Sequence, residues 1–261
     1  MKQGIFRIKE NIKLTPTTYR MRLEGGASEL CAPGQFINIK LGGHFLRRPI
    51  SVCDMEDLGG GNAAVTIIYK VLGHGTEEMS LMSEEAELDV LTGLGNGYDL
   101  GAAGDAPLLI GGGVGVPPLY FAAKELTTKG SEVTALLGFN SADEIYYADE
   151  FERLGCKVII STVDGSKAVK GFVTDAFKEA AKEAVGEAEF TYFYACGPEG
   201  MLRAVYKDVY EGAGLSGEMS FEERMGCGFG ACMGCSTKTK DGYKRICKDG
   251  PVLKAEEILW Q

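Results

Sequence analysis

The sequence predicts a multidomain protein of β and α/β type: an antiparallel β-barrel, then a doubly wound parallel sheet, then a small cysteine-rich C-terminal domain. Short β-branched runs broken by turns fill residues 4–100, and apolar runs alternating with amphipathic segments follow from Pro107. Four closely spaced cysteines lie near the C-terminus. We therefore predict three domains in 261 residues, with boundaries at 1–101, 102–220 and 221–261.

The first region reads as strands separated by turns. Residues 4–11, 17–23, 35–41, 64–72 and 87–93 alternate in polarity or are rich in β-branched side chains. This rhythm predicts an antiparallel barrel or sandwich. The one stretch with a helical pattern runs from Thr76 to Ser83, directly after Gly73-His74-Gly75.

The second region alternates apolar strands with amphipathic helices, which is typical of a parallel, doubly wound sheet. The predicted strands are residues 107–112, 133–139, 157–162, 190–196 and 215–221, and the predicted helices are 117–128, 149–154, 173–184 and 198–210. The eighteen uncharged residues from Ala106 to Ala123 are long enough to span a membrane. Their four glycines and three prolines instead favour a strand, a loop and a helix.

Composition excludes some functions. A net charge of −10 is unfavourable for nucleic-acid binding. The N-terminus has no apolar signal-like run, and thiols in a cluster pattern favour a reducing, cytoplasmic location. Cys31, Cys53, Cys156 and Cys196 are expected to be small buried apolar residues.

The four other cysteines, Cys227, Cys232, Cys235 and Cys247, are spaced C-x4-C-x2-C-x11-C. This spacing matches the plant-type [2Fe-2S] ligand set. The glycines at 226, 228, 230 and 234 suit a tight loop whose N–H groups can point at sulfur. Structural zinc, the main alternative, usually takes two C-x2-C pairs or a Cys/His mixture. Only one such pair is present and neither His is nearby, so the sequence favours iron and sulfur.

Two short motifs in the first region could bind a phosphate. In Arg48-Pro49-Ile50-Ser51 the guanidinium and the hydroxyl can both reach one, although for this motif alone a surface arginine beside a strand is the favoured interpretation. In Gly73-His74-Gly75-Thr76 the backbone N–H groups at a helix start could do the same. The alternative there is a plain turn with Thr76 as the N-cap.

Two loops of the second region resemble each other. The stretch from Gly111 to Pro118 ends a strand in glycines and opens a helix at proline, as expected where backbone approaches a dinucleotide, but it lacks G-x-G-x-x-G. The stretch from Cys196 to Leu202 repeats this arrangement. The two loops could frame one ligand, and Cys196 could equally be a core thiol at a strand end.

Taken in order, RPIS, GHGT, GGGVGVPPL, CGPEGML and the cysteine pattern resemble the ferredoxin-NADP reductase superfamily with a C-terminal [2Fe-2S] domain. Within it, the chain is similar end to end to the electron-transfer subunits of class B, NAD-linked dihydroorotate dehydrogenase. The resemblance implies an FAD site, a nicotinamide site and a cluster site. The FAD residues would be Arg48, Pro49, Ile50, Ser51, Ile68, Tyr69, Lys70, Gly75 and Thr76. The nicotinamide would lie between Gly112, Gly113, Val114, Gly115 and Pro117 on one side and Cys196, Gly197, Pro198 and Glu199 on the other. Gly95-Asn96-Gly97 resembles the family's segment between domains.

The resemblance also implies the activity. Electrons from dihydroorotate would pass from the FMN of a partner catalytic subunit through [2Fe-2S] and FAD to NAD⁺, in pyrimidine (UMP) biosynthesis, within a heterotetramer of two plus two subunits. This relay agrees with the chemistry, because of the three cofactors the flavin is the one that can exchange both a hydride and single electrons. No catalytic side chain is expected in this chain. Met225, Phe229 and Met233 are candidates for the covered face near the cluster, unless they pack the small domain's own core.

Two alternatives remain open at this point. One is the FAD and [2Fe-2S] subunit of an NADH-dependent ferredoxin or sulfide reductase. The other is a metal-binding or scaffold protein that lost its redox role. NAD is favoured over NADP because residues 161–166 contain no arginine for a 2′-phosphate, although Lys167 is close.

Overall fold

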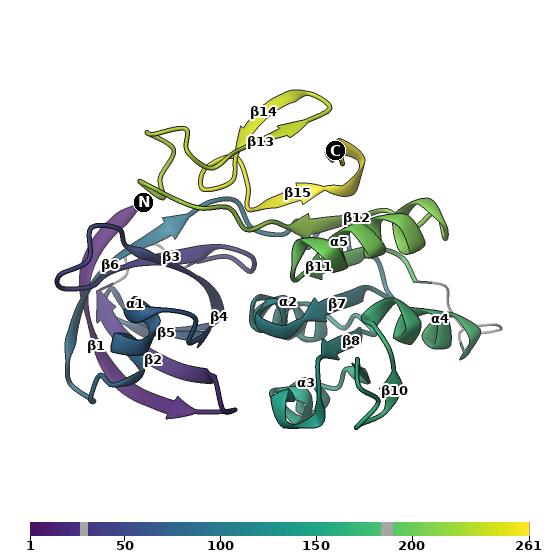
Figure 1. Cartoon of the computed structure of the whole chain (residues 1–261), viewed down its shortest axis with the longest axis horizontal. Helices are drawn as coiled ribbons and strands as arrows, with labels where there is room; N and C mark the ends of the chain where they lie inside the picture. The colour runs from purple at the N-terminus through teal and green to yellow at the C-terminus, as the bar shows by residue number, and fades with distance from the viewer. Residues whose placement is uncertain (27–30, 184–189, 261) are drawn as a thin grey trace.

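The computed structural model describes residues 1–26, 31–183 and 190–260. A barrel and an α/β body lie side by side, and the C-terminal residues 221–260, here called the cysteine segment, run across both (Figure 1). None of the described helices is both long and apolar enough to cross a membrane.

The first body is a closed antiparallel barrel with the strand order β1-β2-β5-β4-β3-β6. Its interior holds apolar side chains such as Ile8, Met21, Ile37 and Val65, each fully buried. One short helix, α1, follows β5. The elements are β1 (Lys2–Lys13), β2 (Thr18–Gly26), β3 (Phe36–Lys40), β4 (Arg48–Gly59), β5 (Asn62–Lys70), α1 (His74–Ser80) and β6 (Glu87–Leu94).

The second body is a seven-stranded sheet with the order β10-β9-β8-β7-β11-β12-β15. All neighbours pair in parallel except β12 and β15. Its elements are β7 (Leu108–Gly112), α2 (Val116–Thr128), β8 (Thr134–Phe139), α3 (Ala148–Arg153), β9 (Lys157–Thr162), β10 (Val169–Lys170), α4 (Val173–Glu183), β11 (Phe193–Cys196), α5 (Glu199–Val205), β12 (Gly217–Ser220) and β15 (Val252–Lys254). The strand β13 (Ser236–Thr239) and the strand β14 (Gly242–Arg245) form a separate hairpin.

The predicted fold class is confirmed, with the barrel realised instead of the sandwich. Several boundaries differ from those predicted. The helix predicted from Thr76 begins at His74 and ends at Ser80, and the helix predicted from Pro198 to Tyr210 changes to a wider π-helical turn after Val205. The last residue of the predicted helix 173–184 lies outside the described residues.

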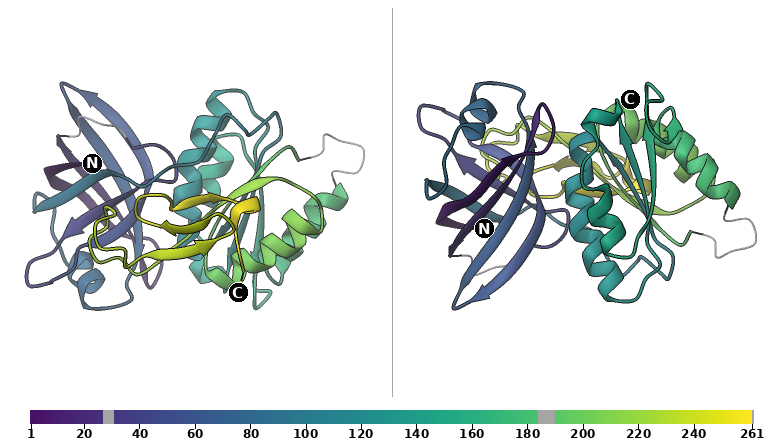
Figure 2. Two further views of the ribbon diagram at one scale, coloured as in Figure 1. Left: turned by 90° about the horizontal axis from the view of Figure 1, so that it is seen from above. Right: turned by 90° about the horizontal axis from the view of Figure 1, so that it is seen from below.

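The cysteine segment is joined to both bodies. Strand β15 adds an antiparallel edge to the large sheet through pairs such as Met219 with Leu253. On the barrel side, the backbone N–H of Asn96 donates to the carbonyl of Gly250 at 2.5 Å. Figure 2 shows the same crossing from above. The segment therefore fixes its cysteines relative to both bodies.

The barrel and the α/β body also contact each other directly. Cys53 and Ile68 of the barrel belong to the same buried apolar cluster as Leu119 of α2. Beside it, Nζ of Lys124 lies 2.7 Å from Oδ1 of Asp54. Through this apolar contact, β4 and β5 of the barrel pack against α2 of the second body.

Candidate functional site

The two phosphate motifs of the barrel meet. Gly75 is buried at the start of α1, and a β-carbon placed there would overlap the guanidinium of Arg48. Nη1 of Arg48 donates to the carbonyl of Leu46 at 2.6 Å, and Nη2 lies 2.9 Å from Nδ1 of His44. Because Gly75 has no side chain, the guanidinium of Arg48 can lie against the start of α1. A cation beside the start of a helix suits a phosphate.

Thr76 has a different local role from the one considered in the sequence. The N-cap of α1 is Gly73, so the alternative with Thr76 as N-cap is wrong. Oγ1 of Thr76 accepts from the backbone N–H of Leu72 at 3.0 Å and donates to the carbonyl of Gly73 at 3.0 Å. The threonine therefore fixes the turn that carries Gly75.

The three candidate residues of β5, Ile68, Tyr69 and Lys70, point alternately to the two faces of the strand. Tyr69 is buried in the barrel, where its hydroxyl donates to Oδ1 of Asn11 at 2.9 Å. Ile68 packs toward the α/β body, and Nζ of Lys70 lies 3.9 Å from Oε1 of Glu144. Because the hydroxyl of Tyr69 already has a partner, this residue could meet a ligand only through its backbone.

The two glycine loops of the α/β body lie in contact. Strands β7 and β11 are neighbours, and Cys196 pairs with Gly111 where both strands end. A β-carbon on Gly115 would overlap the carbonyl of Cys196, and one on Gly112 would overlap the sulfur of Met201. Val114 is 38% exposed at the tip of its loop. The loops thus form the adjoining walls that a dinucleotide site at this edge requires.

Cys196 stays protonated at neutral pH. Burial raises the pKa of its thiol to about 12, against the opposing effect of a hydrogen bond with Ser220. The side chain is only half-buried by area and packs against the apolar cluster that contains Tyr98. A protonated thiol can line a site, but it cannot serve as a base.

One cavity of about 740 Å³ is bordered by the barrel, the α/β body and the cysteine segment, but among the described residues its wall contains none of the four cysteines and no residue of the first glycine loop. Its wall contains Pro49 of β4, the stretch Gly197 to Glu199 at the end of β11, and Phe221 to Met225 of the cysteine segment. This volume is typical of small-molecule and cofactor sites. Pro49 of the barrel motif, the second glycine loop and the start of the cysteine segment therefore border one open pocket.

The four cysteines fall into two pairs. The sulfur of Cys227 accepts from the backbone N–H of Cys232 at 3.4 Å, and the N–H of Cys227 points at the sulfur of Cys232 at 3.5 Å. The N–H of Cys247 points at the sulfur of Cys235 at 3.4 Å. Among the described residues, no three His, Cys, Asp or Glu side chains are grouped to hold one metal ion. Two pairs of thiols agree with the two-iron ligand set that the spacing predicts.

The two pairs differ in environment. Cys232 is exposed, whereas Cys235 and Cys247 are 2% and 1% exposed. Partial burial acts to raise the pKa of Cys227, but backbone N–H groups, that of Phe229 first, lower it to about 6. Burial, reinforced by Cys235, raises the pKa of Cys247 to about 12. Cys227 is thus poised as thiolate, whereas Cys235 and Cys247 are embedded in protein.

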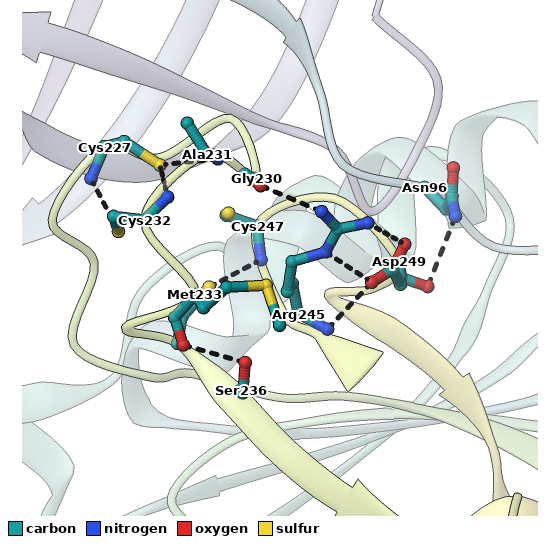
Figure 3. Close-up of polar contacts among 11 residues, drawn as sticks. Asn96, Cys227, Gly230, Ala231, Cys232, Met233, Ser236, Arg245, Cys247 and Asp249 are labelled. Carbon is teal, nitrogen blue, oxygen red and sulfur yellow. Dashed lines mark hydrogen bonds and ion pairs between the residues drawn. The ribbon is translucent and has the colours of Figure 1, made fainter. Parts of the chain in front are cut away.

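Arg245 holds the loop between the pairs (Figure 3). Its Nη1 donates to the carbonyl of Gly230 at 2.8 Å, and its Nε lies 2.9 Å from Oδ2 of Asp249. The carbonyl of Asp249 accepts from Nδ2 of Asn96 at 3.2 Å. Sequence reasoning placed Asn96 between domains but missed its contact with the cysteine segment, and it missed Arg245 altogether.

The apolar residues near the cysteines divide between surface and core. Phe229 and Met233 are 44% and 55% exposed. Met225 instead packs partly against the buried cluster of Phe36, Leu94 and Cys247. Of the three residues considered for a covered face, two are therefore available on the surface of the described chain.

Comparisons with known proteins agree with this geometry. A family model for the "Iron-sulfur cluster binding domain of dihydroorotate dehydrogenase B" matches residues 222–259, and one for an "Oxidoreductase NAD-binding domain" matches residues 109–207. The electron transfer subunit of dihydroorotate dehydrogenase B from Fusobacterium nucleatum is 42% identical over 259 residues, covering 96% of each chain. Its counterpart from a Geobacillus species is 41% identical over 274 residues, covering 99% of each chain. A solved structure of an NADH-dependent reduced ferredoxin-NADP oxidoreductase superimposes with a TM-score of 0.84 at 29% identity, covering 98% of this chain and 90% of the other.

Proposed function

The chain belongs to the family of electron transfer subunits of dihydroorotate dehydrogenase B, and from this premise we propose how its residues carry electrons from dihydroorotate to NAD⁺. Dihydroorotate loses two electrons and two protons, NAD⁺ takes up a hydride, and one proton is released. Bound flavin and cluster supply the exchange between hydride and single electrons. The observation that carries the proposal is a cavity bordered by Pro49 of the barrel motif, the second glycine loop and the cysteine segment.

In this proposal the FAD is held by the barrel. The guanidinium of Arg48, set against Gly75, binds the pyrophosphate, and Pro49, Ile50 and Ser51 border the flavin. Supporting this, Pro49 lies on the shared cavity and Arg48 lies at the start of α1. Ile68, Tyr69 and Lys70 contribute mainly backbone, and Thr76 keeps the turn of α1 in place.

The nicotinamide lies between the two glycine loops, with Gly112, Gly113, Val114 and Gly115 facing Cys196, Gly197 and Pro198. Close packing of the loops leaves backbone as the main contact surface. The carboxylate of Asp164, held in its turn by the hydroxyl of Ser166 at 2.6 Å, follows β9 and disfavours a 2′-phosphate. Faster reduction by NADH than by NADPH in parallel stopped-flow measurements would support NAD as the cofactor, and equal rates would contradict it.

The cluster is held by Cys227, Cys232, Cys235 and Cys247. Pairing of the thiols, a loop rich in glycine and N–H groups directed at sulfur all fit this group. Cys235 and Cys247 are buried beside Phe36 of the barrel, whereas Cys227 is half-buried and Cys232 is exposed. With the cluster bound, Cys232 would lie on the side open to a partner, and Cys235 and Cys247 would lie on the side of the barrel that would hold the flavin.

The partner is an FMN-containing catalytic subunit, assembled with this chain as two plus two in the cytoplasm. A subunit named for electron transfer needs a second redox centre elsewhere, which supports such a partner. The exposed side chains of Phe229 and Met233 beside the loop are apolar, as the centre of a protein interface often is. Mass measurement of the co-purified complex tests the stoichiometry.

The direct test is to co-express this chain with the FMN subunit and follow dihydroorotate-dependent NAD⁺ reduction. Arg48→Ala should lower FAD retention by at least about 10-fold, because a charge-assisted phosphate contact is lost. Arg47→Ala is the matched control, since the neighbouring guanidinium pairs with Asp89 at 3.0 Å and not with Gly75. Unchanged NAD⁺ reduction when the whole chain is omitted would refute the function.

A further inference from the structure

Asn38 is a buried polar side chain on barrel strand β3 whose amide has no partner. It is 1% exposed. Within the described part of the chain, neither end of its carboxamide takes part in a hydrogen bond, and Oδ1 is fully enclosed. An amide offers two donors and an acceptor, and burying one unpaired is costly. The fully enclosed unpartnered atom is the acceptor Oδ1, whereas Nδ2, which carries the two donors, is left free to meet a group that is not part of the polypeptide.

The surroundings of Asn38 indicate where this partner lies. Alternation along β3 places Phe36 and Asn38 on the same, outer face of the barrel. Phe36 packs with Cys235 and Cys247 in one buried cluster. A β-carbon on Gly228 would overlap Nδ2 of Asn38, so this nitrogen lies against the residue that follows Cys227.

Asn38 also connects the cysteine loop to the barrel motif. Across the β3–β4 ladder it is paired with Pro49, which borders the shared cavity. The backbone N–H groups of Ala231 and Cys232 already donate to the sulfur of Cys227 at 3.2 and 3.4 Å. The amide of Asn38 would add a donor that comes from the barrel and not from the loop itself.

We propose that the side-chain N–H of Asn38 donates a hydrogen bond to a sulfur at the Cys227 end of the bound [2Fe-2S] cluster and raises its reduction potential. The inference rests on the proposed function, because it needs the cluster. A hydrogen bond to sulfur stabilises the more negative, reduced cluster, so removing the donor lowers the potential. Asn38 is a positioning residue that tunes electron transfer without taking part in bond changes.

The test is a redox titration of the reconstituted full chain, followed by the electron paramagnetic resonance signal of the reduced cluster. Asn38→Leu keeps the approximate volume and removes the donor. Its midpoint potential should fall by about 59 mV, which is a tenfold change in the ratio of oxidised to reduced cluster for one electron. Asn38→Asp should lower it further, since a negative charge opposes reduction, and it carries the test if Asn38→Leu does not fold.

Phe36→Leu is the matched control, because it alters packing on the same face and removes no donor. A shift equal to that of Asn38→Leu would assign the effect to packing and overturn the proposal. An unchanged cluster potential in both Asn38 variants, with or without a change in FAD retention, would also overturn it. Wild-type protein that forms no cluster contradicts the proposed function as well, whereas a wild-type cluster with no shift in the variants contradicts only the role of Asn38.

Discussion

The two pairs of cysteines that we propose as one ligand set lie in different environments. Cys227 and Cys232 are carried by a loop whose Gly228 and Gly230 have φ angles of +75° and +91°. Cys235 and Cys247 are buried beside Phe36 and other apolar residues of the barrel. The first pair depends on backbone geometry and the second on packing.

This difference separates two requirements of an electron carrier. The buried pair would fix one side of the proposed cluster to the barrel, which carries the predicted flavin motif. The loop pair leaves the other side accessible to a partner, and its N–H groups keep Cys227 ready to bind iron as thiolate. The stretch from residue 227 to residue 247, shorter than 25 residues, thus contains both the buried pair and the more accessible loop pair.

Removing one ligand from each pair gives the largest expected effect. Cys232→Ser and Cys247→Ser should both lose the visible absorbance of the cluster and more than about 100-fold of NAD⁺ reduction, because ligand loss exceeds the usual cost of losing an outer contact. In cluster-free protein, Cys247→Ser should lower the free energy of unfolding, measured with urea, by about 1–3 kcal/mol, because a hydroxyl is buried there. Cys232→Ser should stay within about 0.5 kcal/mol of the wild type.

Cys156→Ser is the control for these two variants. It also places a hydroxyl at a buried position, 7% exposed, but in the α/β body. It should lower stability and keep the cluster. Equal stability losses for the Cys232 and Cys247 variants would remove the distinction between the two pairs.

Thiol reactivity should sharpen the comparison. In cluster-free protein at pH 7, iodoacetamide should modify Cys227 at least about 100-fold faster than Cys247, because only thiolate reacts. With a pKa of about 6 for Cys227 and about 12 for Cys247, the first is mostly ionised at this pH and the second is not. The rate at Cys227 should fall as the pH drops below about 6. Peptide mapping by mass spectrometry measures each rate, and equal rates at pH 7 would contradict the assignment.

A smaller effect is expected for the residue that joins the pairs. Arg245→Gln removes the contacts with Gly230 and Asp249, and the cluster should bleach about 10-fold faster in air, as is usual for outer contacts of a metal site. Lys244→Gln removes an adjacent cation whose partner is Glu257, at 2.7 Å. Bleaching that accelerates equally in both variants would indicate a general charge effect.

The smallest effect concerns the glycine loop itself. Gly228→Ala and Gly59→Ala both place alanine at φ +75°. The left-handed conformation alone should cost about 1–2 kcal/mol in each. Gly228 also contacts Asn38, whereas nothing lies within 4 Å of a β-carbon at Gly59. Urea unfolding should therefore show that Gly228→Ala loses about 1 kcal/mol more free energy of unfolding than Gly59→Ala, in the range of a strained contact. Equal losses would mean that Asn38 moves away from the added methyl group at no cost.

Much of the fold could be predicted because its signals are local. Strand runs, glycines at strand ends and Pro117 at a helix start indicated the elements of both bodies, and the structure confirms their class. Cysteine spacing indicated a metal site for the same reason. The domain boundaries and the individual cofactor residues stay predictions.

The remaining features depend on contacts between distant parts of the chain. Asn38 reads in the sequence as one polar residue in an alternating strand, and only the return of the cysteine segment gives it a role. Arg245 meets Gly230 fifteen residues away. The antiparallel pairing of β15 with β12 follows from where the segment docks, and the local pattern of residues 252–254 contains no sign of it.

Strand β15 has one more consequence, for chains that end early. In a chain stopped at Phe221, the backbone N–H and C=O groups of β12 that now pair with β15 would form an open sheet margin. Such margins recruit other strands and promote aggregation. The segment that carries the four cysteines therefore also covers the edge of the large sheet. Losing it would promote aggregation of the protein and would also remove the predicted cluster ligands.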